Sequence, residues 1–198
     1  MHARITLEET PLFADPSGAL YWPARRTLVL AEPDLASRAN SEKLRLLVRR
    51  YAPARVVCLG PARGSVPPDW IVLAHEQAIG EDKLVLRHRP AAGDTLAPGE
   101  IVGGLRPAAA LETRHGRREG PCFALDGRRM AMPAFGTHAG GTHAGGTHAG
   151  GSDVRAPALV RLFGRARVRV LLLGADRLQL VARDRLVAYG NTPIKRTI

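Results

Sequence analysis

The sequence is poor in lysine: Lys43, Lys83 and Lys195 are the only ones among 29 basic residues, so arginine supplies almost all of the positive charge. Aromatic residues make up 5% of the chain and do not alternate with basic ones, as they would on a surface that stacks single-stranded bases. No run approaches the roughly 18 apolar residues of a membrane-spanning helix. The first ten residues also lack the apolar stretch of a secretion signal. We therefore expect a cytoplasmic protein with no membrane partner.

Cysteine is scarce as well. Cys58 and Cys122 lie in apolar, strand-like stretches, which predicts buried free thiols in a reducing compartment rather than a disulfide. Positive charge is abundant, with a formal net charge of +11. That charge favours a polyanionic partner such as DNA. The arginine, alanine, glycine and proline content equally fits the coding bias of a GC-rich genome, so both interpretations stay open.

The length of 198 residues and the hydrophobic content of 45% suit a single domain with a real core. A helix is predicted over 41–51, with Ser41 as its N-cap and Pro53 ending it. Two hairpins are predicted around Asp15–Gly18 and Asp126–Gly127. Further strands are expected at 27–30, 54–60, 69–74, 83–86, 100–102, 168–173 and 178–181, and a second helix at 154–162. This order indicates a mixed α/β sandwich.

The connection between the strands at 54–60 and 69–74 is unusually short. A parallel crossover normally needs a dozen or more residues and a helix, whereas "GPARGSVPPD" contains Pro67 and Pro68 and cannot be helical. Two explanations follow from this spacing. Either the two strands are not parallel neighbours, or a connecting helix has been lost.

A perfect pentapeptide repeat, "GTHAGGTHAGGTHAGG", occupies residues 136–151. Its histidines, His138, His143 and His148, carry imidazoles that suit Zn, Ni or Cu. A spacing of five in a glycine-rich segment imposes no preformed geometry, however. We interpret the repeat as replication slippage in a loop that tolerates insertion, with adventitious metal binding, and the competing hypothesis is a metal reservoir.

Seven stretches, which together span most of residues 10–178, form a recognisable series: "PLFADPSGALYWPARRTLVLA", "RYAPARVVCLG", "WIVLAHEQ", "LRHRP", "PGEIVGGLRP", "RREGPCFALDGRRMAMPAFG" and "DVRAPALVRLFGRARVRVLLLGADRL". In the order of these motifs the chain resembles the calcineurin-like metallophosphoesterases, and more closely the bacterial ligase-associated DNA damage response phosphoesterase (endonuclease) family. The resemblance implies an α/β (α+β) fold, a calcineurin-like β-sandwich flanked by helices. Here that fold would be truncated, because the family's helical segments after its first motif and between its second and third motifs are missing.

The family holds two divalent ions with Asp, His and Asn at strand ends, and those ions activate water and clamp phosphate. Its first motif, Asp-x-His, is matched by Glu32 and Asp34. Its Gly-Asp, whose carboxylate bridges the metals, is matched by Gly60-Pro61, which offers no ligand. Its Gly-Asn-His-Asp is matched by 74–77, where His75 takes the Asn position and Glu76 the catalytic His position.

The family's lone histidine after a strand is matched by His88, the only ligand kept in kind. Its Gly-His-x-His-Pro is matched by 103–107, where both imidazoles are lost and Arg106 appears. The surviving candidates for binding one divalent metal, Mn or similar, are Glu32, Asp34, His75 and His88. In that arrangement His75 or Glu76 would handle the proton and Arg106 would bind phosphate.

Two functions compete on these grounds. The first is a catalytically impaired member of the family, a basic module that binds DNA or a DNA-repair protein. The second is an active metal-dependent phosphoesterase with a rebuilt mononuclear site. The missing helical segments predict exposed apolar surface, and therefore a partner or poor solubility. We assign residues 1–181 to one domain and residues 182–198 to an unstructured basic tail, and we expect Trp22, Trp70 and Phe135 in the core.

Overall fold

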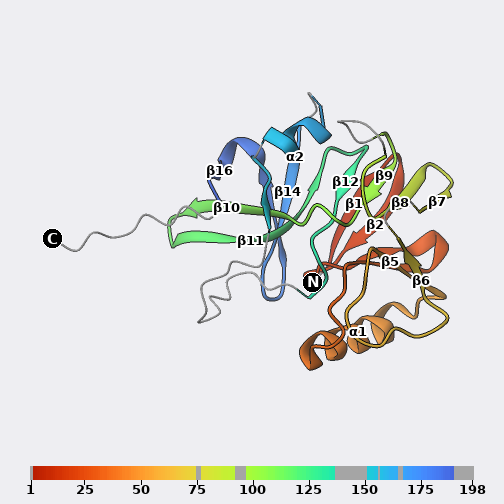
Figure 1. Cartoon of the computed structure of the whole chain (residues 1–198). Coiled ribbons are helices and arrows are strands. Elements are labelled where there is room, and N and C mark those ends of the chain that lie inside the picture. Colours follow the sequence, from red (N-terminus) through yellow and green to blue (C-terminus); the bar gives the residue numbers. More distant parts are fainter. Residues whose placement is uncertain are drawn as a thin grey trace.

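The computed structural model describes residues 2–74, 77–91, 97–136, 151–155, 157–164 and 167–189. Within these residues two β-sheets pack face to face, and a helix covers part of each outer face (Figure 1). The first sheet has the order β1-β2-β3-β4-β5-β6, with the helix α1 (Arg38–Tyr51) outside it. Its strands are β1 (Ala3–Leu7), β2 (Thr10–Ala14), β3 (Leu20–Trp22), β4 (Thr27–Ala31), β5 (Arg55–Leu59) and β6 (Ile71–Leu73).

The second sheet follows the order β13-β10-β11-β12-β9-β8-β7, and β14, β15 and β16 are attached to it. The helix α2 (Pro157–Leu162) packs on its outer face. The strands are β7 (Ala78–Glu81), β8 (Leu84–Arg87), β9 (Glu100–Val102), β10 (Pro107–Thr113), β11 (Gly116–Leu125), β12 (Met130–Ala131), β13 (Ser152–Asp153), β14 (Arg169–Leu173), β15 (Leu178–Ala182) and β16 (Leu186–Val187). Short 3-10 turns follow β3 at Pro23–Arg25 and β15 at Arg183–Arg185.

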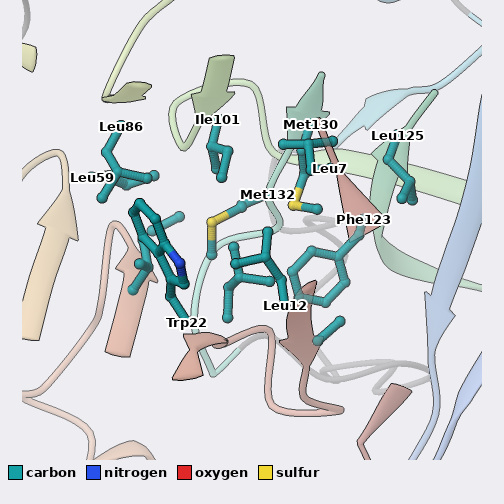
Figure 2. Close-up of a cluster of buried hydrophobic side chains, with 14 of the residues drawn as sticks. Leu7, Leu12, Trp22, Leu59, Leu86, Ile101, Phe123, Leu125, Met130 and Met132 are labelled. Atoms are coloured by element: carbon teal, nitrogen blue, oxygen red, sulfur yellow. The ribbon is translucent and has the colours of Figure 1, made fainter. Parts of the chain in front are cut away.

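The main core lies between the two sheets. Apolar side chains from alternate positions of both sheets meet there, because successive residues of a strand point to opposite faces (Figure 2). Trp22 and Leu59 come from the first sheet and contact a layer of the second sheet that contains Ile101, Phe123 and Met132. Separate clusters join α1 to the first sheet and α2 to the second. The mixed α/β sandwich predicted from the sequence is confirmed in this coarse form.

Both hairpins form where turn chemistry predicted them. The short connection between β5 and β6 can be described as well. These two strands are parallel neighbours, with Val57 opposite Ile71. Residues 60–70 between them contain no helix. The first explanation is therefore wrong, and this parallel crossover is made without a helix; the loss of a helix stays a prediction. Cys58 and Cys122 are buried free thiols, as predicted.

Two sequence predictions were wrong in detail. Ser41 is not the N-cap of α1, because its amide donates to the carbonyl of Ser37 at 3.0 Å and its hydroxyl donates to the carbonyl of Leu35 at 2.9 Å. The helix therefore begins one turn earlier, at Arg38. Residues 182–189 are not unstructured, because β16 pairs with β10 and Leu186 is buried among the side chains around α2. Residues 190–198 lie outside the described part.

A buried carboxylate ties the first hairpin to α1. Asp15 is 4% exposed. One of its oxygens accepts from the amide and hydroxyl of Ser17, and the other accepts from Arg50 at 3.1 Å and from the Tyr51 hydroxyl at 3.0 Å. Burial first, and then Asp15, raise the pKa of Tyr51 to about 12 against the opposing effect of Arg50, so the phenol stays a donor.

We predict that Asp15→Asn lowers the free energy of unfolding by about 1–3 kcal/mol, because an amide nitrogen replaces the oxygen that faces two donors. Urea denaturation at pH 7 measures this. Asp69→Asn, at an exposed position, is the matched control and should shift stability by less than about 0.5 kcal/mol. The phenol of Tyr51 should also ionise at lower pH in Asp15→Asn. Equal stability of the two variants would contradict the role given to Asp15.

Candidate functional site

The candidate site lies where parallel strands of both sheets end. β4, β5 and β6 run parallel in the first sheet, so Glu32, Gly60 and Ala74 follow their carboxyl ends at one edge. β8 and β9 run parallel in the second sheet, and they are followed by His88 and Gly103. The carboxyl ends of parallel strands are a common place for ligand sites in α/β sheets. Here the edges of two sheets meet at the same place.

Gly60 and Gly103 let the two edges approach this closely, and Gly104 leaves further room for His88. A Cβ at Gly103 would lie 2.6 Å from the Cβ of Leu59, and a Cβ at Gly104 would lie 2.8 Å from the Nε2 of His88. At Gly60, where φ is +104°, a Cβ would lie 2.4 Å from the Cδ2 of His88. The imidazole of His88, which is 3% exposed, therefore occupies a slot that only glycine backbones leave open.

The backbone of β9 fixes the position of His88. The amide of Gly103 donates to the carbonyl of Arg87 at 3.2 Å, and the amide of Gly104 donates to the carbonyl of His88 at 2.7 Å. On the other side of Arg87, the buried carboxylate of Glu100 lies 3.1 Å from its Nε and accepts the amide of Ala91 at 2.9 Å. The backbone of His88 is thus fixed by contacts of the residues before and after it, independently of the contacts of its side chain.

Glu32 meets two cationic or polar partners at this edge. Its Oε1 lies 3.1 Å from the Nε2 of His88, and its Oε2 accepts from the Nε of Arg106 at 2.5 Å. An ionised carboxylate only accepts hydrogen bonds, so the contact with His88 places a proton on Nε2. The Glu32 side chain is 11% exposed and that of Arg106 is 50% exposed, so the carboxylate is sheltered and the guanidinium faces solvent.

The electrostatics of the cluster follow from these contacts. Burial by itself raises the pKa of Glu32. The hydrogen bonds from Arg106 and His88, and the charges of both groups, outweigh burial and lower its pKa overall. The hydrogen bond to Glu32 raises the pKa of Arg106 against its own burial. The cluster therefore holds a carboxylate ion at neutral pH, compensated by a guanidinium.

The structure brings together three of the predicted site residues: Glu32, His88 and Arg106. Asp34 lies nearby on the loop after β4, where its carbonyl accepts from the Nδ2 of Asn40 at 3.0 Å. Its Oδ1 is buried and has no hydrogen-bond partner among the described residues. His75, Glu76, His138, His143 and His148 lie outside the described residues, so their predicted roles stay predictions.

The described residues do not fit a metal site. No group of three His, Cys, Asp or Glu side chains in this part of the chain is placed to hold a metal ion. Glu32 and His88 would be two ligands, but Arg106 occupies one oxygen of that carboxylate with a positive charge. The other strand ends, at Gly60-Pro61 and Gly103-Gly104, offer no side-chain ligand. The predicted divalent metal, Mn or similar, stays a prediction.

The contact between Arg106 and Glu32 was not predicted from the sequence, which assigned Arg106 to phosphate binding alone. The contact joins residues 74 positions apart, and no local sequence pattern predicts it. The glycine slot around His88 was also not predicted, although a glycine directly after a strand, at Gly60, is a readable signal of close backbone approach. Among the described residues, no helix is long and apolar enough to cross a membrane.

Comparison with solved structures shows what this fold is similar to. The fold is similar to that of the crystal structure of the Pseudomonas putida nuclease MPE, with a TM-score of 0.58 and 20% sequence identity over 91% of this chain and 100% of the nuclease chain. No protein-family model matches the sequence, and no curated protein matches it. The chain thus shares a nuclease-like fold.

We predict that Gly60→Ala lowers the free energy of unfolding by about 2–4 kcal/mol, because the new methyl group must displace His88 and the backbone has a positive φ. Gly80→Ala is the control, since a Cβ there meets no atom within 4 Å. Urea denaturation compares the two variants, and the NMR signal of the His88 ring should shift only in Gly60→Ala. An unperturbed His88 signal in Gly60→Ala would disprove the slot.

Proposed function

We propose that this chain is a nuclease-fold protein that binds the phosphates of nucleic acid through the edge around Arg106 without hydrolysing them. The observation that carries the proposal is the ion pair between Arg106 and Glu32, at the strand ends where the resembling enzymes hold their metals. In this protein the guanidinium of Arg106 supplies the positive charge that a bound metal ion supplies in such enzymes. The protein is an inactive relative in this proposal, and DNA is its ligand.

Phosphate binding is supported by the donors left at this edge. Arg106 uses its Nε for Glu32, and within the described residues its two terminal nitrogens have no hydrogen-bond acceptor. Arg63, on the loop after β5, and Arg89, directly after His88, are exposed, and neither has a carboxylate partner in the described part of the chain. Arginine suits phosphate because its planar donors match two oxygens at once.

The absence of hydrolysis is supported by charge. A metal-dependent phosphoesterase needs a cation held by several ligands to activate water and to stabilise the transferred phosphoryl group. A cation bound to Glu32 would share that carboxylate with the guanidinium of Arg106, at a separation where like charges repel strongly. Pro61 stands where the resembling family has its bridging carboxylate, so no carboxylate from the end of β5 offsets that repulsion.

A metal-dependent phosphoesterase with a rebuilt site is the second candidate. The contact between Glu32 and His88 joins an oxygen and a nitrogen ligand of the kind that Mn or Zn accepts. The buried, unpartnered Oδ1 of Asp34 is the other observation in its favour. This candidate requires Arg106 to leave Glu32 and also requires ligands from the undescribed residues. It would act on DNA or another phosphodiester.

The first test is hydrolysis of bis(p-nitrophenyl) phosphate with added manganese, using a known nuclease as the positive control. We expect no turnover above the protein-free background, because Arg106 competes with the metal for Glu32. Turnover that depends on manganese and is lost in both Glu32→Gln and His88→Ala would overturn the proposal and establish the enzyme. Turnover that survives both substitutions would indicate a contaminating nuclease.

The second test is binding to a fluorescently labelled DNA duplex at several salt concentrations. Each phosphate contact contributes a slope of about −0.9 to the plot of log affinity against log salt. Glu32→Gln should bind several-fold more tightly with a steeper slope, because it removes the negative charge beside Arg106 and releases that cation. Arg89→Ala and Arg63→Ala should each make the slope shallower by about one phosphate contact.

Arg4→Ala is the matched control for this binding test. Arg4 is exposed on the edge strand β1, so its substitution removes the same charge at a different place on the surface. It should change the slope by less than half as much. If Arg4→Ala and Arg89→Ala weaken binding equally, the DNA is held by diffuse charge and the site around Arg106 is not the binding edge. Weaker binding by Glu32→Gln would contradict the proposal in the same way.

A further inference from the structure

An apolar groove lies between α1 and the connection from β5 to β6. It encloses about 370 Å³, and its lining includes Leu44 and Val48 of α1 and Pro67 and Trp70 of the connection. Trp70 was expected in the core, but it is only half-buried and packs beside the cluster under α1. Its other side contributes to the groove.

The groove exists because α1 covers only part of the sheet. Leu47 of α1 is 3% exposed, whereas Val48, one position later, is 40% exposed. On β6, Ile71 and Leu73 pack in the core between the sheets, so Val72 points to the side of α1 and is 40% exposed. Residues 60–70 form no helix that would cover these side chains. Val48 lines the groove itself, and apolar side chains that gather in an exposed groove favour an interaction site.

The charge on the rim is of one sign. Arg45 and Arg49 line the groove one helical turn apart, and none of the described acidic residues lines it. Arg45 is paired with Glu42 at 2.6 Å, but both side chains are about half exposed and such pairs are weak. Arg49 has no carboxylate at ion-pair distance among the described residues. An occupant with acidic side chains beside its apolar ones would complement this rim.

We propose that this groove binds an amphipathic segment of a partner protein, with apolar side chains that fill the space between Val48 and Trp70 and acidic side chains that pair with Arg45 and Arg49. A second copy of the chain is disfavoured, because each copy carries a net charge of +11. Nucleic acid is disfavoured because the apolar lining is aliphatic apart from Trp70, which leaves one ring for stacking. The proposal does not depend on phosphate binding at Arg106.

The test is a selection from a display library of random 16-residue peptides against the purified full-length protein. Enriched peptides are then measured by fluorescence anisotropy against Val48→Asp and Leu46→Asp. These two residues are a matched pair, because both are exposed on α1, and Leu46, 50% exposed, does not line the groove. Thermal unfolding of each variant confirms that α1 remains folded.

We expect enriched peptides that combine acidic and large apolar residues. Their affinity should fall at least about tenfold in Val48→Asp, as for central contacts of an interface, and stay within about twofold in Leu46→Asp. Arg49→Glu should also weaken them, whereas Arg38→Glu, exposed on α1 outside the groove, should not.

Three results would overturn the proposal. The first is a library that yields no peptide able to distinguish Val48→Asp from Leu46→Asp. The second is a set of enriched peptides without acidic residues, which would contradict the expected pairing of acidic side chains with Arg45 and Arg49. The third is a labelled oligothymidine that displaces the peptides and itself binds Val48→Asp more weakly, which would make the groove a nucleic-acid site. DNA binding at the edge around Arg106 is scored by the salt slopes of Glu32→Gln and Arg89→Ala, so the two proposals can fail separately.

Discussion

The close packing at Gly60, Gly103 and Gly104, of which the first two bring the two sheets together, is the constraint on which the candidate site depends. A side chain at any of these positions would push the ends of the strands apart, since the space beside each one is already filled by Leu59 or by His88. The slot holds His88 at a fixed distance from β4, and this places its Nε2 against the carboxylate of Glu32. A buried carboxylate then needs a compensating charge, and Arg106 supplies it from the loop after β9.

The backbone around this cluster is strained in a way that fits the contact. Glu32 has φ of 40° and Arg106 has φ of 45°, the left-handed region that costs a non-glycine residue about 1 kcal/mol or more. The two residues are bonded to each other across the sheets, and charge-assisted hydrogen bonds of this kind are among the stronger ones in proteins. The ion pair therefore joins the two strained turns that present it.

The sequence predicted those parts of the fold that depend on local chemistry. The Asp15–Gly18 and Asp126–Gly127 turns and the apolar run of β5 are dictated by their own residues, and they appear where expected. Contacts between distant segments were not predictable from one sequence. The helix start was misplaced because the hydroxyl of Ser41 bonds to Leu35, six residues back, and residues 182–189 were misjudged because Leu186 finds its burial against a distant strand. Glu32 and His88 were predicted as site residues from a resemblance, but the contact between Arg106 and Glu32 was visible only in the structure.

The connection between β5 and β6 shapes both proposed surfaces. At its start, Pro61 follows Gly60 at the carboxyl end of β5 and contributes no polar side chain to the edge, so the charge of Glu32 is balanced by Arg106. At its end, Pro67 and Trp70 form one wall of the groove beside α1, and no helix lies over them. A connection that crossed with a helix would cover Val48 and Val72 and close the groove. The same stretch of eleven residues, 60–70, thus contributes no side-chain ligand to the edge at Gly60-Pro61 and no helix beside the groove. This is the structural reason for expecting binding, rather than hydrolysis, from both surfaces.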